Sequence, residues 1–394
     1  MFWQLFCKEL KYYFKSITYF IFALGVIVFC FSQVKPSINV DDIKPKSPQE
    51  IDEIISKLPE QDRMQAKFGF ERNYGRKTIT DIKMKQKVVC NYLEQELSEG
   101  KIGTYKLGLL KKIKTSEKQE NDLRDEIKKI SPEKEISETD FINVLDEIDK
   151  IIGGGSNYGE KFRDALFQTG ASYEVALEEY NAIVKEDKIT NAYAREFADY
   201  MGITAGIFPI FIAAFVLIKD MKSRTQEIIF TKKVSSLKYI LTKYLATIVA
   251  FIIPYFILAT YETVIFSKVG AELNVAIDYF AFYKYVLTWI LPTLMFVTAL
   301  GMILAVVVKN PIPAIIIQIL LWIVSITELR GSYGIQKILI RYNEITSNAE
   351  YIKYINNIAI NRVFYFVLSI GILMLTIYIY NRRRCSVGEK LNLL

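Results

Sequence analysis

Two ionisable side chains, Lys243 and Glu262, are the only ones that lie well inside the apolar stretches between residues 200 and 380 of this 394-residue chain. A charge at the centre of a bilayer costs roughly 2.5–3.5 kcal/mol, so a charged residue in such a stretch is a candidate for transport chemistry. Glu262 lies about one turn from the end of its stretch. Two interpretations are open: a group on a transport path, or a carboxylate solvated at the membrane interface. Lys243 lies one turn from the opposite end of the same stretch, where its long side chain can reach water.

Other residues that could support chemistry are few. The chain has no histidine, which removes the commonest general base and the commonest metal ligand. Its four cysteines have no C-x-x-C spacing, which argues against a zinc site. No G-x-x-x-x-G-K-[ST] sequence is present, so the chain does not bind ATP by that route. We therefore expect no catalytic residue, metal site or cofactor in this chain, and no enzyme activity. Ion-coupled transport is also poorly supported, because it usually needs ionisable groups at the membrane midplane.

Six stretches that are nearly free of ionisable side chains determine the fold class. Each is close to the roughly 20 residues that a helix needs to cross a bilayer. A mean hydropathy of +0.19 with 24% charged residues fits a membrane part combined with a water-facing part. The expected transmembrane helices are residues 17–33, 200–218, 239–266, 285–308, 312–327 and 363–380.

A charged block separates the first apolar stretch from the other five. Residues 34–200 contain 28 Lys and Arg against 33 Asp and Glu, whereas the rest of the chain contains 22 against 10. Helix-start signals occur at Ser47-Pro48-Gln49-Glu50, Ser131-Pro132-Glu133 and Ser137-Glu138-Thr139-Asp140. Residues 79–98 and 105–130 read as long charged helices that can form an antiparallel hairpin. Carboxylates dispersed among lysines are typical of solvated helix faces, so this block reads as a helical domain without chemistry.

The fold class is therefore all-α, a polytopic membrane protein with a helical domain, residues 34–199, inserted between transmembrane helices 1 and 2. The distribution of Lys and Arg predicts its orientation. Fourteen of them lie in the short segments on one side of the membrane, including residues 219–238 and 381–394, against seven in residues 267–284 and 328–362. The positive-inside rule then places both termini in the cytoplasm and the inserted domain outside. Because the basic excess lies beside the spans, we expect the lipid bilayer and no nucleic acid as a partner.

The outer connection 328–362 is unusually basic for that side of the membrane. Within it, residues 334–342 read as an amphipathic helix with Ile335, Ile338 and Leu339 on one side. Such a helix would lie in the interface or dip into the membrane against protein. An ordinary surface helix is the alternative, and the sequence does not separate the two.

Two further segments read as amphipathic helices on the cytoplasmic side. The N-terminal residues 1–16 form an interfacial helix with an aromatic-rich face. The connection 219–238 is the one inner loop long enough to receive a partner, with Ile228, Ile229 and Phe230 between charged flanks. Plain anchoring by positive charge, without a partner, is the alternative for both.

Together these features resemble the ABC-2 type permeases, the membrane subunits of ATP-binding-cassette exporters. That family has an elbow helix before span one, a coupling helix between spans two and three, and a start of span three of the form Thr-x-x-x-Ser-x-x-x-Tyr-x-x-x-Lys. Here this last pattern falls on Thr231, Ser235, Tyr239 and Lys243. Over about 90 residues the chain is similar to permeases of Gram-positive bacteria that carry a large outer domain. The residues that carry this likeness are 152–158, 194–200 and 208–211.

The resemblance implies an export permease of a bacterial plasma membrane. Two permease subunits, identical or related, would associate with two copies of a separate ABC ATPase, which would bind ATP and Mg. Arg224, Glu227, Lys232 and Lys233 would be the coupling-loop residues that contact the ATPase. The family's outer segment, here 328–362, often folds back into the membrane.

Two other functions stay open from the sequence. A mechanotransmission protein would use the same ATP-driven tilt to work its outer domain on a peptide antibiotic or a lipid, and the size of the inserted domain favours this. A membrane receptor or scaffold would bind a ligand outside and signal through residues 219–238. An intramembrane enzyme is disfavoured by the absence of histidine and of paired intramembrane acids.

Overall fold

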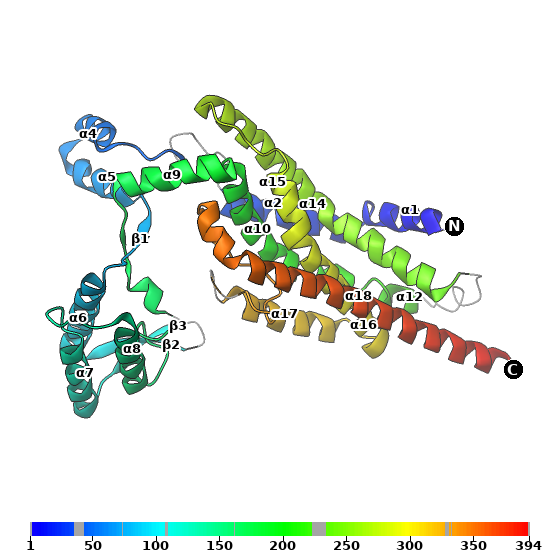
Figure 1. Ribbon diagram of the computed structural model, residues 1–394. Coiled ribbons are helices and arrows are strands. Elements are labelled where there is room, and N and C mark those ends of the chain that lie inside the picture. The colour runs from blue at the N-terminus through cyan, green and yellow to red at the C-terminus, as the bar shows by residue number, and fades with distance from the viewer. Residues whose placement is uncertain are drawn as a thin grey trace. The chain divides into compact units, whose positions relative to one another are not determined.

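The computed structural model describes residues 2–34, 43–72, 74–106, 109–160, 162–222, 234–327, 331 and 333–392. It divides into two compact units. The membrane unit comprises residues 1–43 and 179–394, and the inserted unit comprises residues 44–178. Both are mostly helical (Figure 1).

In the inserted unit, helices begin at the expected start signals Ser47 and Ser137, whereas the start expected at Ser131 is wrong, because the chain forms a turn there. Ser47, Ser116 and Ser137 each accept a hydrogen bond from a backbone N–H of the following first turn, at Glu50, Gln119 and Asp140. Its helices are α4 (Pro48–Ser56), α5 (Glu60–Arg72), α6 (Ile82–Glu99), α7 (Glu117–Lys129), α8 (Glu138–Ile152) and the 3-10 turn η1 (Arg163–Ala165), with α9 (Tyr173–Asp187) leading out of the unit.

Two small antiparallel sheets in the inserted unit correct the all-α expectation. Strand β1 (Arg76–Thr78) pairs with β4 (Gln168–Gly170), and β2 (Lys101–Lys106) pairs with β3 (Leu109–Lys114). The helix expected over residues 105–130 is therefore wrong in its first half. Gly100 ends α6 in the left-handed conformation, and the chain then turns back as a strand whose Ile102 is fully buried. A lysine-rich strand and a lysine-rich helix face look alike when only charge is counted.

The inserted unit has its own hydrophobic core. Leu93 and Leu97 from α6 pack with Leu123 from α7 and with Leu145 and Ile148 from α8. Tyr158, in the loop after α8, joins this core with no exposed surface. The three long helices and the β2–β3 hairpin therefore form one packed body around these side chains.

The membrane unit contains the long apolar helices. Among the described residues, four segments are long and apolar enough to cross a membrane, 190–221, 236–273, 281–308 and 348–385, and a fifth if α1 and α2 count as one bent span. Residues Ile312–Ile326 form a shorter apolar helix. The elements are α1 (Phe2–Tyr13), α2 (Ile17–Gln33), α10 (Thr190–Ile207), α11 (Ile210–Ala213), α12 (Ile218–Lys222), α14 (Ser236–Leu273), α15 (Ala281–Tyr285), η2 (Val286–Ile290), α16 (Leu291–Val308), α17 (Ile312–Ile326) and α18 (Asn348–Asn392).

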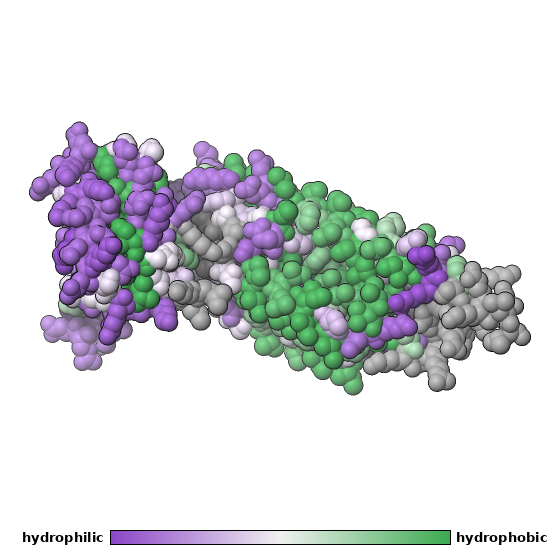
Figure 2. Space-filling model, turned by 90° about the horizontal axis from the view of Figure 1, so that it is seen from below, coloured by the Kyte–Doolittle hydropathy of each residue, from purple (hydrophilic) through white to green (hydrophobic). Residues whose placement is uncertain are grey.

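The surface hydropathy differs between the membrane unit and the inserted unit. In Figure 2 a broad field of hydrophobic residues covers the visible face of the unit, while the inserted unit is mostly hydrophilic on the face shown. α14 and α18, with 38 and 45 residues, exceed the roughly 30 Å hydrocarbon thickness at 1.5 Å per residue. Both helices must therefore extend beyond the apolar layer. Helices α1 and α2 meet at an angle of 69°.

Prolines interrupt two of the long helices. α10 ends next to Pro209, and short helical turns continue the segment to Lys222. Just before Pro292, the five residues of η2 widen into a π-helical turn. Proline has no N–H and its ring collides with the carbonyl four residues earlier, which disturbs the α-helical bonding of the preceding turn. Helix α14 nevertheless continues through Pro254.

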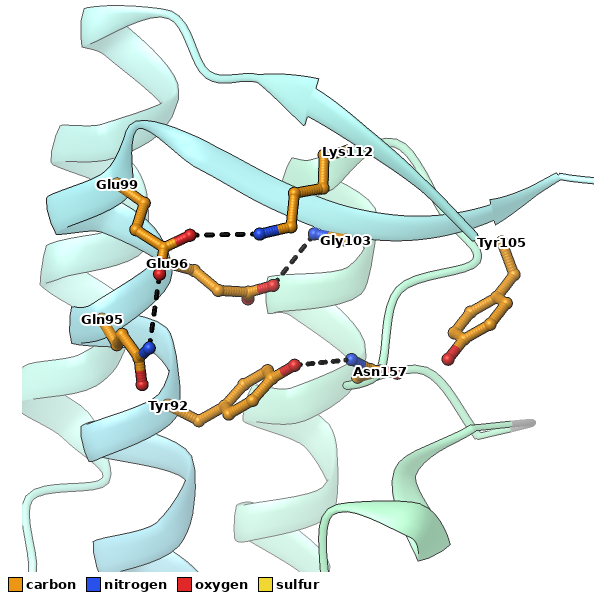
Figure 3. A pocket seen from close by; sticks show the side chains of 8 residues that line it. All are labelled: Tyr92, Gln95, Glu96, Glu99, Gly103, Tyr105, Lys112 and Asn157. Atoms are coloured by element: carbon orange, nitrogen blue, oxygen red, sulfur yellow. Dashed lines mark hydrogen bonds and ion pairs between the residues drawn. The ribbon is translucent and has the colours of Figure 1, made fainter. Parts of the chain in front are cut away.

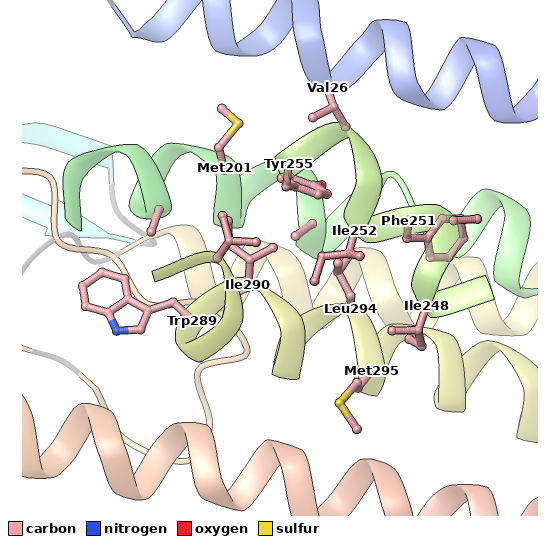
Figure 4. Packing of buried hydrophobic residues seen from close by; sticks show 14 of the residues in the cluster. Val26, Met201, Ile248, Phe251, Ile252, Tyr255, Trp289, Ile290, Leu294 and Met295 are labelled. Carbon is pink, nitrogen blue, oxygen red and sulfur yellow. The ribbon is translucent and has the colours of Figure 1, made fainter. Parts of the chain in front are cut away.

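The centre of the membrane unit is packed with large apolar side chains. Figure 4 shows Val26 of α2, Met201 of α10, Phe251 and Tyr255 of α14, and Leu294 of α16 in one cluster. Small residues allow the closest helix approach. A Cβ atom on Gly301 would lie 2.9 Å from Ala213, so α16 and α11 meet almost backbone to backbone.

A substitution at Gly155 can test how closely the inserted unit is packed around this residue. Gly154 and Gly155 both have positive φ, but only at Gly155 would a Cβ collide, 2.8 Å from the Tyr105 carbonyl oxygen. The Tyr105 N–H donates to the Gly155 carbonyl at 2.7 Å. We predict that Gly155→Ala lowers the opening free energy of the Tyr105 amide by about 1–3 kcal/mol more than Gly154→Ala does. Hydrogen exchange measures both, and equal effects would show that the contact is unimportant.

Candidate functional site

Of the five site residues predicted from the sequence, the structure describes only Glu262. Arg224, Glu227, Lys232 and Lys233 lie outside the residues that the structure describes. Glu262 is described, and it lies on α14 with 2% of its surface exposed. Its role on a transport path stays a prediction. The two ends of the loop that contains the four coupling residues are described, and they converge on a cluster of charges.

This root cluster consists of Glu9, Asp220, Tyr239 and Lys243. The Lys243 ammonium group lies 2.9 Å from a carboxylate oxygen of Glu9 and 3.0 Å from one of Asp220. The Tyr239 hydroxyl donates to the Asp220 carboxylate. Only 7% of the Lys243 side chain is exposed, against 27% for Glu9 and 21% for Asp220. The expectation that Lys243 reaches water is therefore wrong, because two carboxylates compensate its charge inside the protein.

The root cluster joins elements from widely separated parts of the chain. Glu9 belongs to α1, Asp220 to α12, and Tyr239 and Lys243 to α14. α1 is held further by the Tyr13 hydroxyl, which lies 2.6 Å from the Thr247 hydroxyl of α14. Since α12 ends and α14 begins on either side of residues 223–233, the cluster lies at the base of the predicted coupling loop.

The C-terminal part of α18 is bound to the same region. The Tyr380 ring stacks on Tyr239 with 5.5 Å between centroids, and Ser236 donates to Asn381 at 2.9 Å. Arg383 donates to the Val306 carbonyl at the end of α16, and Arg384 donates to the Val234 carbonyl. The end of the last helix is thus tied to the start of α14 and to the end of α16.

A second group, the clamp cluster, consists of Asp187, Arg195, Asp199, Arg341 and Tyr342. Asp199 of α10 accepts from Arg341 Nε at 2.7 Å and from the Tyr342 N–H at 2.7 Å. Arg195 of α10 forms two hydrogen bonds to Asp187 of α9, at 2.8 and 3.0 Å, and donates to the Thr346 carbonyl at 2.7 Å. Its guanidinium lies 5.9 Å from the centre of the Tyr342 ring. Arg195 and Asp199 are both fully buried.

The clamp cluster holds the segment 333–347 inside the helical bundle. Arg362 of α18 continues this anchoring, since it donates to the Trp289 carbonyl at 2.9 Å and to the Ile338 carbonyl at 3.1 Å. Thr293 also donates to the Ile338 carbonyl at 2.9 Å. Arg362 therefore connects α18, the π-helical turn η2 and segment 333–347 through backbone oxygens.

The amphipathic helix expected at residues 334–342 is wrong. The structure has no helix there, and every residue from Lys337 to Tyr342 is buried. Side chains replace the missing helical hydrogen bonds: Ser325 accepts from the Ile338 N–H at 2.9 Å, and Asn361 donates to the Lys337 carbonyl at 2.9 Å. A helix would present one apolar face, whereas residues 337–342 are all enclosed by protein and residues 334–336 are exposed. Burial of Ile338 and Leu339 against neighbouring helices agrees with the part of the expectation that put them against protein.

Both clusters consist mainly of charged side chains that pair with one another. In the described part of the chain no group of His, Cys, Asp and Glu side chains could hold a metal ion. The carboxylates of both clusters form ion pairs with Lys or Arg. Paired buried charges resist separation strongly, because breaking one pair leaves an uncompensated charge. The helices that they join must therefore move together or exchange partners.

Comparison with known families supports the sequence resemblance. The family model described as ABC-2 family transporter protein matches residues 11–379. No curated protein and no solved structure matches the chain. The matched region includes both clusters, apart from Glu9.

We predict that Lys243→Met lowers the stability of the membrane unit by about 2–3 kcal/mol, because two carboxylates lose their cation while still reaching some solvent. Adding Asp220→Asn should restore part of this loss, since fewer buried charges then stay uncompensated. Thermal unfolding in detergent micelles measures both. Lys238→Met, an exposed lysine on the same helix, is the control and should change little. Equal effects of Lys238→Met and Lys243→Met would contradict the proposed strength of the root cluster.

We also predict that Arg341→Met releases the segment 333–347. Loss of the Asp199 partner costs about 3 kcal/mol, so protection of the Tyr342 and Ile338 amides from hydrogen exchange should fall by about 100-fold. The double variant with Asp199→Asn should recover part of the protection. Lys353→Met removes an exposed ion pair with Glu350 and serves as the control. Unchanged protection in Arg341→Met would show that apolar packing alone retains the segment.

Proposed function

This chain belongs to the ABC-2 family of transporters, and from that premise we propose that it is a permease subunit driven by a separate ATPase that binds at residues 219–238. The observation that carries the proposal is the root cluster. It joins α1, α12 and α14 at the base of that loop through the Lys243 ion pairs. A displacement of the loop would pass directly to three helices of the membrane unit.

We propose six membrane crossings, with both termini and residues 219–238 in the cytoplasm of a bacterium. Contacts within the membrane unit support a common end for these parts. Glu9 of α1 and the end of α18 both meet the start of α14, through Lys243 and through Ser236–Asn381. Basic residues are concentrated in the same parts of the sequence, as the positive-inside rule requires of a cytoplasmic side.

In this mechanism ATP and Mg belong to the partner ATPase, and a second permease copy or a related permease completes the transporter. ATP-driven closure of the ATPase pair would move residues 219–238, and the root cluster would carry this movement into α14 and α18. Glu262, buried on α14, is the side chain we place nearest a transport path. The chemistry of the exported substrate stays open.

Mechanotransmission is the second candidate, and one observation favours it. The junction between α9 and α10 has positive φ at two non-glycine residues, Lys188 and Ile189, and Ile189 is 1% exposed. Such a conformation is unfavourable for a β-branched residue and persists only where the surroundings enforce it. The Asp187–Arg195 pair bridges this junction. Since α9 leads out of the inserted unit, a stiff junction would let movement of α10 reach that unit.

Co-isolation tests the partnership directly. The tagged chain is expressed with its genomic neighbours, purified from membranes, and assayed for a bound ATPase and for ATP hydrolysis. We predict that an ABC ATPase co-purifies and that Glu227→Arg reduces its recovery at least tenfold. Glu135→Arg makes the same charge reversal at an exposed site of the inserted unit and should leave recovery unchanged. Failure of the unmodified chain to retain any ATPase would contradict the proposal.

Deleting residues 45–177 separates the two candidates. Substrate efflux that survives the deletion would support transport and exclude mechanotransmission. Loss of function with the ATPase still bound and active would favour mechanotransmission.

A further inference from the structure

A small cavity lies in the inserted unit between α6, the β2–β3 hairpin and the loop after α8 (Figure 3). Its volume is about 160 Å³. The side chains of Glu96 and Glu99 line it from α6, and those of Tyr105 and Lys112 line it from the two strands. Because ligand pockets for drug-sized molecules usually measure 300–1,000 Å³, this cavity suits a single side chain or head group.

Glu96 gives the cavity its charge. One carboxylate oxygen accepts from the Gly103 N–H at 2.9 Å, and the other accepts from the Tyr158 hydroxyl at 2.8 Å. No cation of the described chain lies within ion-pair distance of Glu96, because the Lys112 ammonium group binds Glu99 instead, at 3.1 Å. Each oxygen of Glu96 retains acceptor capacity after these bonds. Partial burial raises the pKa of the Glu96 carboxyl.

Aromatic rings complete the lining. Tyr92 faces the cavity from α6 and is fixed there by the Asn157 amide, which donates to its hydroxyl at 3.3 Å. Tyr105 lines it from β2, and its ring stacks on Phe162 with 4.3 Å between centroids. The faces of such rings attract cations, and anions are repelled by the two carboxylates. The alkylammonium group of Lys112 lies at the edge of this cavity, so the lining is compatible with a primary ammonium group.

We propose that this cavity is a binding site for an organic cation that ends in a primary ammonium group on a short aliphatic arm. The ammonium would bind Glu96, and the arm would lie against Tyr92 and Tyr105. Lys112 would act as an internal competitor, because it holds Glu99 and adds positive charge at the opening. A lysyl side chain of a peptide and a free alkylamine present the same group. The site belongs to the inserted unit alone and does not depend on the ATPase proposal.

Ligand-observed NMR on the full chain in detergent micelles tests this site. The probe is n-butylammonium, and n-butanol is the uncharged control for partition into micelles. We expect saturable binding of the cation only. Glu96→Gln keeps the shape and the backbone contact but removes the charge, and should weaken binding about tenfold. Lys112→Gln should tighten binding at least threefold, because it removes the competitor.

Glu94→Gln provides the matched control, since Glu94 is an exposed carboxylate on α6 that does not line the cavity, and it should leave the affinity unchanged. Opposite effects of Glu96→Gln and Lys112→Gln are difficult to explain by misfolding, so together they support the site. Equal binding of butanol and butylammonium would overturn it, as would unchanged affinity in Glu96→Gln.

A second probe separates the two sources of the group. Lysine with blocked amino and carboxyl ends binds as tightly as butylammonium if a peptide side chain fits. It binds more than tenfold more weakly if only a free amine can enter.

Discussion

The membrane unit depends on one constraint: a charge removed from water must be compensated inside the protein. Arg195, Asp199 and Lys243 are buried, and each meets groups of opposite charge within about one hydrogen-bond length. The partners of Asp199 and Lys243 are remote in sequence, whereas Asp187 lies close to Arg195 in the chain, on the preceding helix. The need to pair the charges therefore determines which helices lie together, while apolar packing between α14, α16 and α18 supplies most of the cohesion.

The two clusters connect different parts of the membrane unit. The root cluster connects the base of residues 219–238 to α1 and α14, and the clamp cluster retains segment 333–347 between α10 and α18. α18 takes part in both regions, through the Tyr239–Tyr380 contact with α14 in one and through the Arg362 contacts with the π-helical turn before α16 in the other. In the proposed mechanism, movement of the partner ATPase would reach these helices by exchanging or shifting a few strong contacts.

Much of the helical architecture could be predicted from sequence, because long apolar stretches and capping residues such as Ser47 and Ser137 act locally. The β2–β3 hairpin escaped prediction because its lysines also fit a helix face. Segment 333–347 escaped because its structure depends on Asp199 and Arg362, which lie far away in the chain. The Lys243 pairs had no local signal either, since Glu9 and Asp220 are remote from it in sequence and look like ordinary interfacial charges.

The central claim is that the root cluster transmits ATP binding into the membrane unit. A distance measurement between two spin labels tests it most directly. Spin labels replace Leu237 at the start of α14 and Ile335 within segment 333–347, two exposed positions of the membrane unit. The complex with its ATPase is measured with and without a non-hydrolysable ATP analogue. If the root cluster transmits ATP binding into the membrane unit, the distance distribution shifts in the otherwise unmodified chain and stays unchanged in Lys243→Met, with the ATPase bound in both. A shift of the same size in Lys243→Met would contradict the claim.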